Sequence, residues 1–145
     1  MRILLAFNGT KLSDTALQTV IAQYRPQNAE VNVLYVVPAD AWVGEGSQPR
    51  ELVDRAGQAL RTAGFKVETT VLKGATSDAI IDAAVEWNAD LIVLGWHGRA
   101  ALKRFLLGSM SEAVIHDAPC SVELVRMHSL RCESEACRRA EGVAS

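Results

Sequence analysis

The chain has 145 residues and a formal net charge of −2, which is the size of one domain around a single core. The near-neutral balance argues against a general electrostatic binder of nucleic acid, because such proteins carry a concentrated basic surface. The N-terminal apolar run, Ile3 to Phe7, is too short for a membrane span or a signal-peptide core. We therefore expect a cytoplasmic protein with no nucleic-acid and no membrane partner.

Apolar runs alternate with helical periodicity as far as residue 126. Continuous apolar runs indicate strands buried on both faces, whereas apolar residues three or four positions apart indicate helices. The expected elements are a strand at Ile3–Phe7, a helix over Leu17–Tyr24 stopped by Pro26, a strand at Val31–Val37, a loop at Ala39–Pro49, a helix over Leu52–Ala63 ended by Gly64, a half-exposed edge strand at Phe65–Val71, a helix over Ile80–Val85 capped from Thr76 or Ser77, a strand at Asp90–Leu94, a helix from Ser109 to Ile115, and a strand at Val122–Val125.

This alternation predicts an α/β fold, a single doubly wound parallel sheet of five strands with helices on both faces, Rossmann-like. Residues 1–126 form that domain, and the polar stretch 127–145 is expected to be a flexible tail because it lacks an apolar pattern able to pack. In such sheets ligands bind beyond the carboxyl ends of the strands. The loops after the first strand (Asn8 to Leu12), the second (Pro38 onward) and the fourth (Gly95 onward) should therefore converge on a site.

Three cysteines, an odd number without dense spacing, fit a reducing compartment and do not predict a metal site. Cys120 precedes an apolar strand and is expected to be a small buried side chain. Cys132 and Cys137 lie in the polar tail, where His128 is the nearby further ligand, and a structural zinc site needs four. We interpret these two residues as exposed thiols.

Glycines follow the fourth strand in the pattern G-x2-G-x9-G-S, formed by Gly95, Gly98, Gly108 and Ser109. A strand end, glycines and then a helix N-terminus collect unpaired backbone N–H groups that a polyanion can approach closely. The alternative is that the glycines only close turns and that Ser109 with Glu112 forms a capping box. We favour phosphate binding because the pattern combines four positions with a preceding strand and basic residues in the intervening loop, namely Arg99, Lys103 and Arg104.

Four segments together resemble the universal stress protein family, in its nucleotide-binding branch, over almost all of residues 1–126. They are the first strand with its turn, Ile3 to Thr10, the run Asp90 to Gly95, the glycine pattern, and the ending Ala118 to Val122. The resemblance implies the sheet order 3-2-1-4-5, ATP as ligand, and a homodimer joined through the final strand around Val122 to Val125. It also implies that adenine lies over the first turn and receives backbone hydrogen bonds from Val36 or Val37.

The resemblance also implies a set of nucleotide-binding positions. Gly95 and Gly98 would face the ribose and phosphates, and Gly108, Ser109 and Ser111 would bind phosphate. The complete candidate set is Asn8, Gly9, Thr10, Val36, Val37, Gly95, His97, Gly98, Arg99, Gly108, Ser109, Met110 and Ser111. His97 is not read as catalytic, because no serine or cysteine nucleophile stands at a readable spacing.

Two residues depart from the family pattern. Asn8 stands where the family usually has an acidic residue, so the position brings no charge for a metal ion and magnesium assistance is doubtful. Trp96 replaces a small hydroxyl residue and is expected to shield the loop.

We therefore predict a small ATP-binding regulatory or stress-protective dimer with slow or no hydrolysis, nucleotide occupancy being the signal. The alternatives are an ATP-hydrolysing or nucleotidyl-transferring enzyme, and a nucleotide-free dimerisation module.

Overall fold

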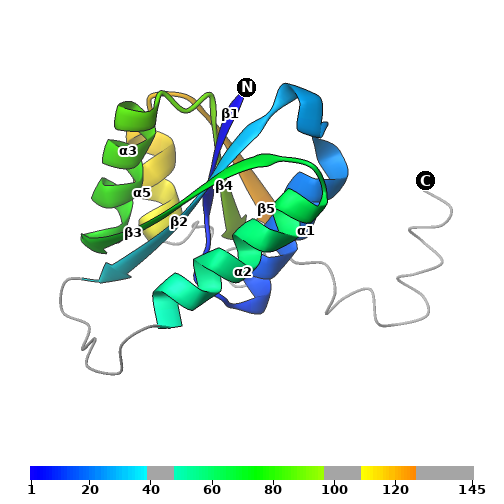
Figure 1. The fold of residues 1–145 in the computed structure, drawn as a ribbon. Coiled ribbons are helices and arrows are strands. Elements are labelled where there is room, and N and C mark those ends of the chain that lie inside the picture. Colours follow the sequence, from blue (N-terminus) through cyan, green and yellow to red (C-terminus); the bar gives the residue numbers. More distant parts are fainter. Residues whose placement is uncertain (39–47, 97–108, 127–145) are drawn as a thin grey trace, which may run out of the picture.

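The computed structural model describes residues 1–38, 48–96 and 109–126. Its five strands form one parallel sheet in the order β3-β2-β1-β4-β5, as predicted, with helices on both faces (Figure 1). In chain order the elements are β1 (Arg2–Ala6), α1 (Lys11–Gln23), the 3₁₀ turn η1 (Pro26–Asn28), β2 (Glu30–Pro38), α2 (Gln48–Thr62), β3 (Lys66–Gly74), α3 (Thr76–Trp87), β4 (Leu91–Trp96), α5 (Ser109–Asp117) and β5 (Ser121–Arg126).

The core consists of two apolar layers, one on each face of the sheet. Helices α1 and α2 cover one face and contribute Leu17, Val20 and Leu60 to its layer. Helices α3 and α5 cover the other face, on the opposite side of the sheet in Figure 1, with Ile80 and Val114. Successive side chains of a strand alternate between these layers, so central strands with apolar residues at every position are buried on both faces.

Local sequence signals explain several helix ends. Thr10 caps α1, because its side chain accepts a hydrogen bond from the backbone N–H of Ser13. Helix α2 ends before Gly64, whose φ of +100° favours glycine, and α3 ends at Asn88 in the left-handed conformation with φ 57°. These residues set the directions in which the chain enters the following strands.

Several predicted boundaries are wrong. Helix α2 begins at Gln48, so Pro49, expected in a loop, lies in the first helical turn, where proline is tolerated because its missing N–H has no partner there. The expected cap of α3 at Thr76 or Ser77 is also wrong, since Ala75 occupies the capping position and makes no side-chain cap hydrogen bond.

Two further elements extend past their predicted limits. Helix α1 already begins at Lys11, so the loop after β1 is shorter than the predicted stretch from Asn8 to Leu12. Strand β4 continues through Gly95, which pairs with Val125 of β5 and therefore lies in the sheet rather than in the following loop. Cys120 is half-buried against the α3–α5 layer rather than fully buried.

The two edge strands are β3 and β5. The predicted half-exposed character of the third strand is confirmed, since most residues of β3 are only partly buried. In the described part of the chain, no helix is long and apolar enough to cross a membrane. Residues 127–145, the predicted tail, lie outside the described residues.

Candidate functional site

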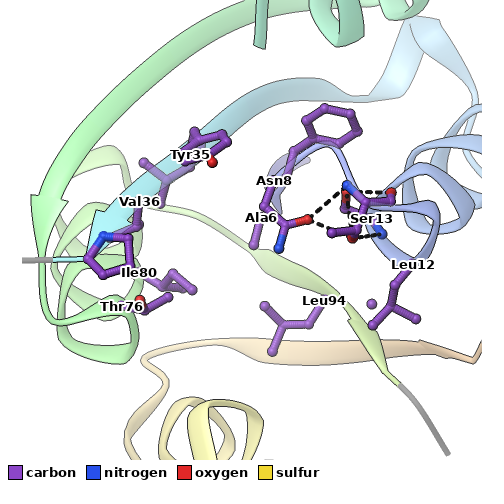
Figure 2. A pocket seen from close by; sticks show the side chains of 14 residues that line it. Ala6, Asn8, Leu12, Ser13, Tyr35, Val36, Thr76, Ile80 and Leu94 are labelled. Atoms are coloured by element: carbon purple, nitrogen blue, oxygen red, sulfur yellow. Dashed lines mark hydrogen bonds between the residues drawn. The ribbon is translucent and has the colours of Figure 1, made fainter. Parts of the chain in front are cut away.

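A cavity of about 300 Å³ lies at the carboxyl ends of β1, β2 and β4, the three strands whose following loops were predicted to converge. It extends from the start of α1 to the start of α3 (Figure 2). Its lining is mostly apolar, and none of the described residues that line it carries a charged side chain. The lining residues are Ala6, Phe7, Asn8, Thr10, Leu12, Ser13, Leu34, Tyr35, Val36, Pro38, Thr76, Ile80, Leu94 and Gly95.

Hydrogen bonds among Asn8, Thr10 and Ser13 build the polar end of this cavity. The Asn8 Oδ1 atom accepts from the Thr10 backbone N–H at 3.1 Å and from the Thr10 hydroxyl at 2.7 Å. Thr10 Oγ1 in turn accepts from the Ser13 backbone N–H at 3.2 Å, and the Ser13 hydroxyl donates to the Thr10 carbonyl oxygen at 3.0 Å. This is an Asx-type turn followed by a helix cap, so the three polar side chains are ordered before any ligand arrives.

Gly95 brings β4 into direct contact with the first turn of α1. A Cβ at position 95 would lie 2.7 Å from the carbonyl oxygen of Leu12 and 2.8 Å from its Cγ. Both residues line the cavity. The resemblance assigns Gly95 to ribose and phosphates, and the packing supplies a separate reason for glycine, which is the close approach of a helix to a strand.

Gly9 is required by the turn rather than by the cavity. Its φ is +81°, and a Cβ there would meet the side chain of Leu52 at 2.9 Å. The lining of the cavity does not include Gly9, which lies on the side facing α2. The glycine therefore explains how the chain turns sharply between β1 and α1 while Leu52 packs over the turn.

The opposite end of the cavity is apolar and contains a residue that the sequence analysis did not select. Val36 from β2 and Ile80 from α3 lie at this end, with Thr76 at the first position of α3 (Figure 2). Thr76 was treated as a helix cap, and no local pattern distinguishes a capping hydroxyl from one that lines a cavity. Only the packing of α3 against β2 and β3 brings it to the site.

The predicted binding residues have different positions. Asn8, Thr10, Val36 and Gly95 line the cavity together. Val37 is 7% exposed and Ser111 is 5% exposed, and neither lines it. Helix α5 begins at Ser109, as predicted, followed by Met110. The remaining candidates, His97, Gly98, Arg99 and Gly108, lie outside the described residues, as do Lys103 and Arg104.

Sequence comparison identifies relatives over most of the chain. A family model described as the universal stress protein family matches residues 1–126. The universal stress protein MJ0531 of Methanocaldococcus jannaschii is 36% identical over 138 residues, covering 86% of this chain and 81% of that protein.

Structural comparison finds the same fold in solved proteins. The structure described as hypothetical protein MJ0577 has a TM-score of 0.74 at 25% identity and covers 87% of this chain and 95% of that one. An Arabidopsis thaliana universal stress family protein with AMP bound has a TM-score of 0.72 at 15% identity, with coverages of 93% and 97%. The Archaeoglobus fulgidus universal stress protein in complex with dAMP has a TM-score of 0.65 at 24% identity, with coverages of 86% and 97%.

At 15% and 24% identity, the Arabidopsis and Archaeoglobus structures show only that the fold is shared. The family model and the sequence relative, in contrast, cover most of this chain. The chain belongs to the universal stress protein family.

Proposed function

We propose that this protein binds an adenine nucleotide, ATP in particular, in the cavity between the starts of α1 and α3. The observation that carries the proposal is the division of that cavity into an apolar end and a hydrogen-bonding end. A nucleotide has the same division, because the ring faces of its base are largely apolar whereas its sugar and phosphates are polar. Ligand pockets of this kind commonly combine apolar walls with a few placed polar groups.

The apolar end is the place for the base. Leu34, Val36 and Ile80 offer aliphatic surface there. We assign the hydrogen bonds to the base edge to the β2 backbone near Val36, as the family resemblance implies. The polar end, at Asn8 and the start of α1, then receives the sugar and phosphates. Residues 97–108 follow β4 directly, and we assign the glycines at 98 and 108 with Ser109 to the phosphates.

The ligands of proteins with this fold support the same assignment. The matched structures from Arabidopsis thaliana and Archaeoglobus fulgidus hold AMP and dAMP. Both are adenine nucleotides, so other proteins with this fold bind a ligand of the class that we propose here. The preference for ATP among adenine nucleotides is part of our proposal.

We propose that occupancy of this site is a signal rather than the first step of rapid catalysis. Efficient phosphoryl transfer needs a metal held by carboxylates and a positioned nucleophile. Among the described residues, those that line the cavity include neither aspartate nor glutamate. Nucleotide binding would then shift the protein between conformations whose dimers present different surfaces to a partner protein.

Strand β5 favours a homodimer as part of the same function. It lies at the edge of the sheet, and in the described part of the chain no strand pairs with its outer side. An edge strand presents unpaired backbone N–H and C=O groups that a second copy can satisfy across a two-fold axis. A dimerisation module without nucleotide is the competing function, and nucleotide titration separates the two.

The test is a calorimetric titration of the purified protein with ATP, compared between two substitutions in α3. Thr76→Phe fills the apolar end of the cavity and should weaken binding at least tenfold, or about 1.4 kcal/mol. Asp82→Phe places the same ring at an exposed position of the same helix and should leave affinity unchanged. Absence of binding by the parent protein, or equal affinity for a folded Thr76→Phe variant, would contradict the proposal.

A further inference from the structure

The side chain of Asn8 has a fixed orientation. Its Oδ1 atom accepts from the backbone N–H of Thr10 at 3.1 Å, and a backbone N–H can only donate. The oxygen must therefore face Thr10, which assigns the two ends of the carboxamide by the hydrogen-bond network. The Nδ2 amino group is then the atom on the other side.

The Thr10 hydroxyl locks this orientation further. Because Thr10 Oγ1 accepts from the Ser13 N–H, its own proton is free to point at Asn8 Oδ1, which lies 2.7 Å away. Rotating the carboxamide by half a turn would set its NH₂ group against the Thr10 N–H, so that two donors face each other and both bonds to Oδ1 are lost. The direction of the amide is thus tied to the start of the helix.

The amino group of Asn8 faces the cavity. Figure 2 shows its nitrogen on the side away from the dashed hydrogen bonds, turned toward the space above Leu94. No hydrogen bond from this nitrogen to another described residue is formed. The Thr10 hydroxyl already donates to Asn8 Oδ1 and accepts from the Ser13 N–H, and the Ser13 hydroxyl donates to the Thr10 carbonyl oxygen. Asn8 thus offers a ligand two N–H donors at the polar end.

We propose that Asn8 is a specificity-determining residue, whose amide selects a nucleotide that presents a hydrogen-bond acceptor at this point and binds it without a divalent cation there. The inference rests on the proposed nucleotide-binding function. An aspartate would keep the bonds to Thr10 but would present a negatively charged acceptor to the cavity. Replacing the amide NH₂ group by a carboxylate oxygen therefore turns a hydrogen-bond donor at this point into an acceptor.

The acceptor on the ligand can belong to a phosphate or to the nucleoside. A phosphate oxygen only accepts at neutral pH, and a carboxylate beside it would repel it in a cavity whose described lining carries no positive charge. A ribose oxygen or a ring nitrogen also accepts from the amide. The two sources are separated by comparing AMP with adenosine.

The experiment is a titration of the parent, Asn8→Asp and Asn28→Asp proteins with AMP and with adenosine in EDTA. Asn8→Asp preserves the acceptor for Thr10, so its thermal unfolding should stay close to that of the parent. Asn28→Asp makes the same charge change at an exposed position at the opposite end of the sheet. We expect Asn8→Asp to bind AMP at least tenfold more weakly, about 1.4 kcal/mol, and Asn28→Asp to match the parent.

The outcomes are distinct. A loss with AMP but not with adenosine assigns the acceptor to the phosphate, and a loss with both assigns it to the nucleoside. Equal or tighter binding of AMP by a folded Asn8→Asp protein in EDTA would overturn the inference while leaving nucleotide binding intact. Failure of the parent to bind any adenine nucleotide would instead overturn the proposed function.

Discussion

The Cα of Gly95 lies against the backbone of Leu12, so close that a Cβ at position 95 would be 2.7 Å from the Leu12 carbonyl oxygen. Contacts this short do not occur for real Cβ atoms, and the neighbour here is backbone in the first turn of α1. The end of β4 and the start of α1 can therefore approach this closely only because residue 95 has no side chain. Both line the candidate site, so its polar end depends on this contact.

Replacement of Gly95 by alanine should destabilise the protein by about 1–3 kcal/mol, the usual cost of forcing extra atoms into a packed interior. The measurement is urea unfolding at equilibrium. Gly57→Ala is the comparison, because its nearest neighbours are the side chains of Thr69 and Val67 at 3.1 and 3.3 Å and because alanine favours a helix interior. Equal stability of the Gly95→Ala protein and the parent would show that β4 and α1 separate easily.

Replacement of Gly108 by valine tests the phosphate assignment of the glycine pattern. A side chain there should block close approach of the backbone to the phosphates, so the variant should stay folded and bind ATP at least tenfold more weakly, about 1.4 kcal/mol. Affinity is measured by titration and folding by circular dichroism. A folded variant with the affinity of the parent would remove Gly108 from the binding site.

The unmodified protein should hydrolyse ATP far more slowly than the ~10 s⁻¹ median of ordinary enzymes. The reason is that Asn8 supplies no carboxylate for magnesium coordination. Asn8→Asp should make ATP binding more dependent on magnesium, which titrations with and without the metal would measure. Turnover near the enzyme median by the parent would favour the alternative of an ATP-hydrolysing enzyme.

Substitution in β5 tests the proposed dimer. Val122→Lys should shift sedimentation toward monomer if this side chain meets its counterpart across the two-fold axis, because two lysines would then repel each other. Leu124→Pro should act more severely, since proline removes a ladder donor as well as an apolar contact. A parent protein that sediments as a monomer at micromolar concentration would contradict pairing through β5.

We predict that the protein loses stability at alkaline pH because of Tyr24. Its hydroxyl donates to a carboxylate oxygen of Glu123 at 2.6 Å, and burial, this hydrogen bond and the charge of Glu123 raise the pKa of Tyr24 from 10.0 to about 12. Below pH 10 the tyrosine is protonated in both the folded and the unfolded chain, so its contribution is fully present. Between pH 10 and about 12 the unfolded chain ionises first, and stability falls.

Absorbance of tyrosinate at alkaline pH provides the measurement. The chain has two tyrosines, so the difference between the parent and a Tyr24→Phe variant isolates Tyr24. The difference curve should have its midpoint near pH 12, and the decline in unfolding free energy between pH 10 and 12 should be smaller in the variant. A midpoint near 10 would show that the contact with Glu123 is not kept in solution.

Local patterns in the sequence were sufficient for the order of strands and α-helices and for the two-sided core, but not for several element ends. The apolar run from Ile3 to Phe7 and the buried stretch ending at Leu94 indicated central strands, because only strands covered on both faces are apolar at every position. The strand order and the position of the cavity beyond the carboxyl ends of the strands were also predicted, the first from the family resemblance and the second from the rule for doubly wound sheets.

Tertiary structure decided which side chains meet. Thr76 reaches the cavity because α3 crosses over β2, and Tyr24 meets Glu123 across 99 residues because α1 packs beside β5. The direction of the Asn8 amide depends on Thr10 and the cap of α1, and the need for glycine at position 95 depends on Leu12. A sequence records propensity and periodicity along the chain, whereas these contacts arise only when separate elements pack at defined distances and angles.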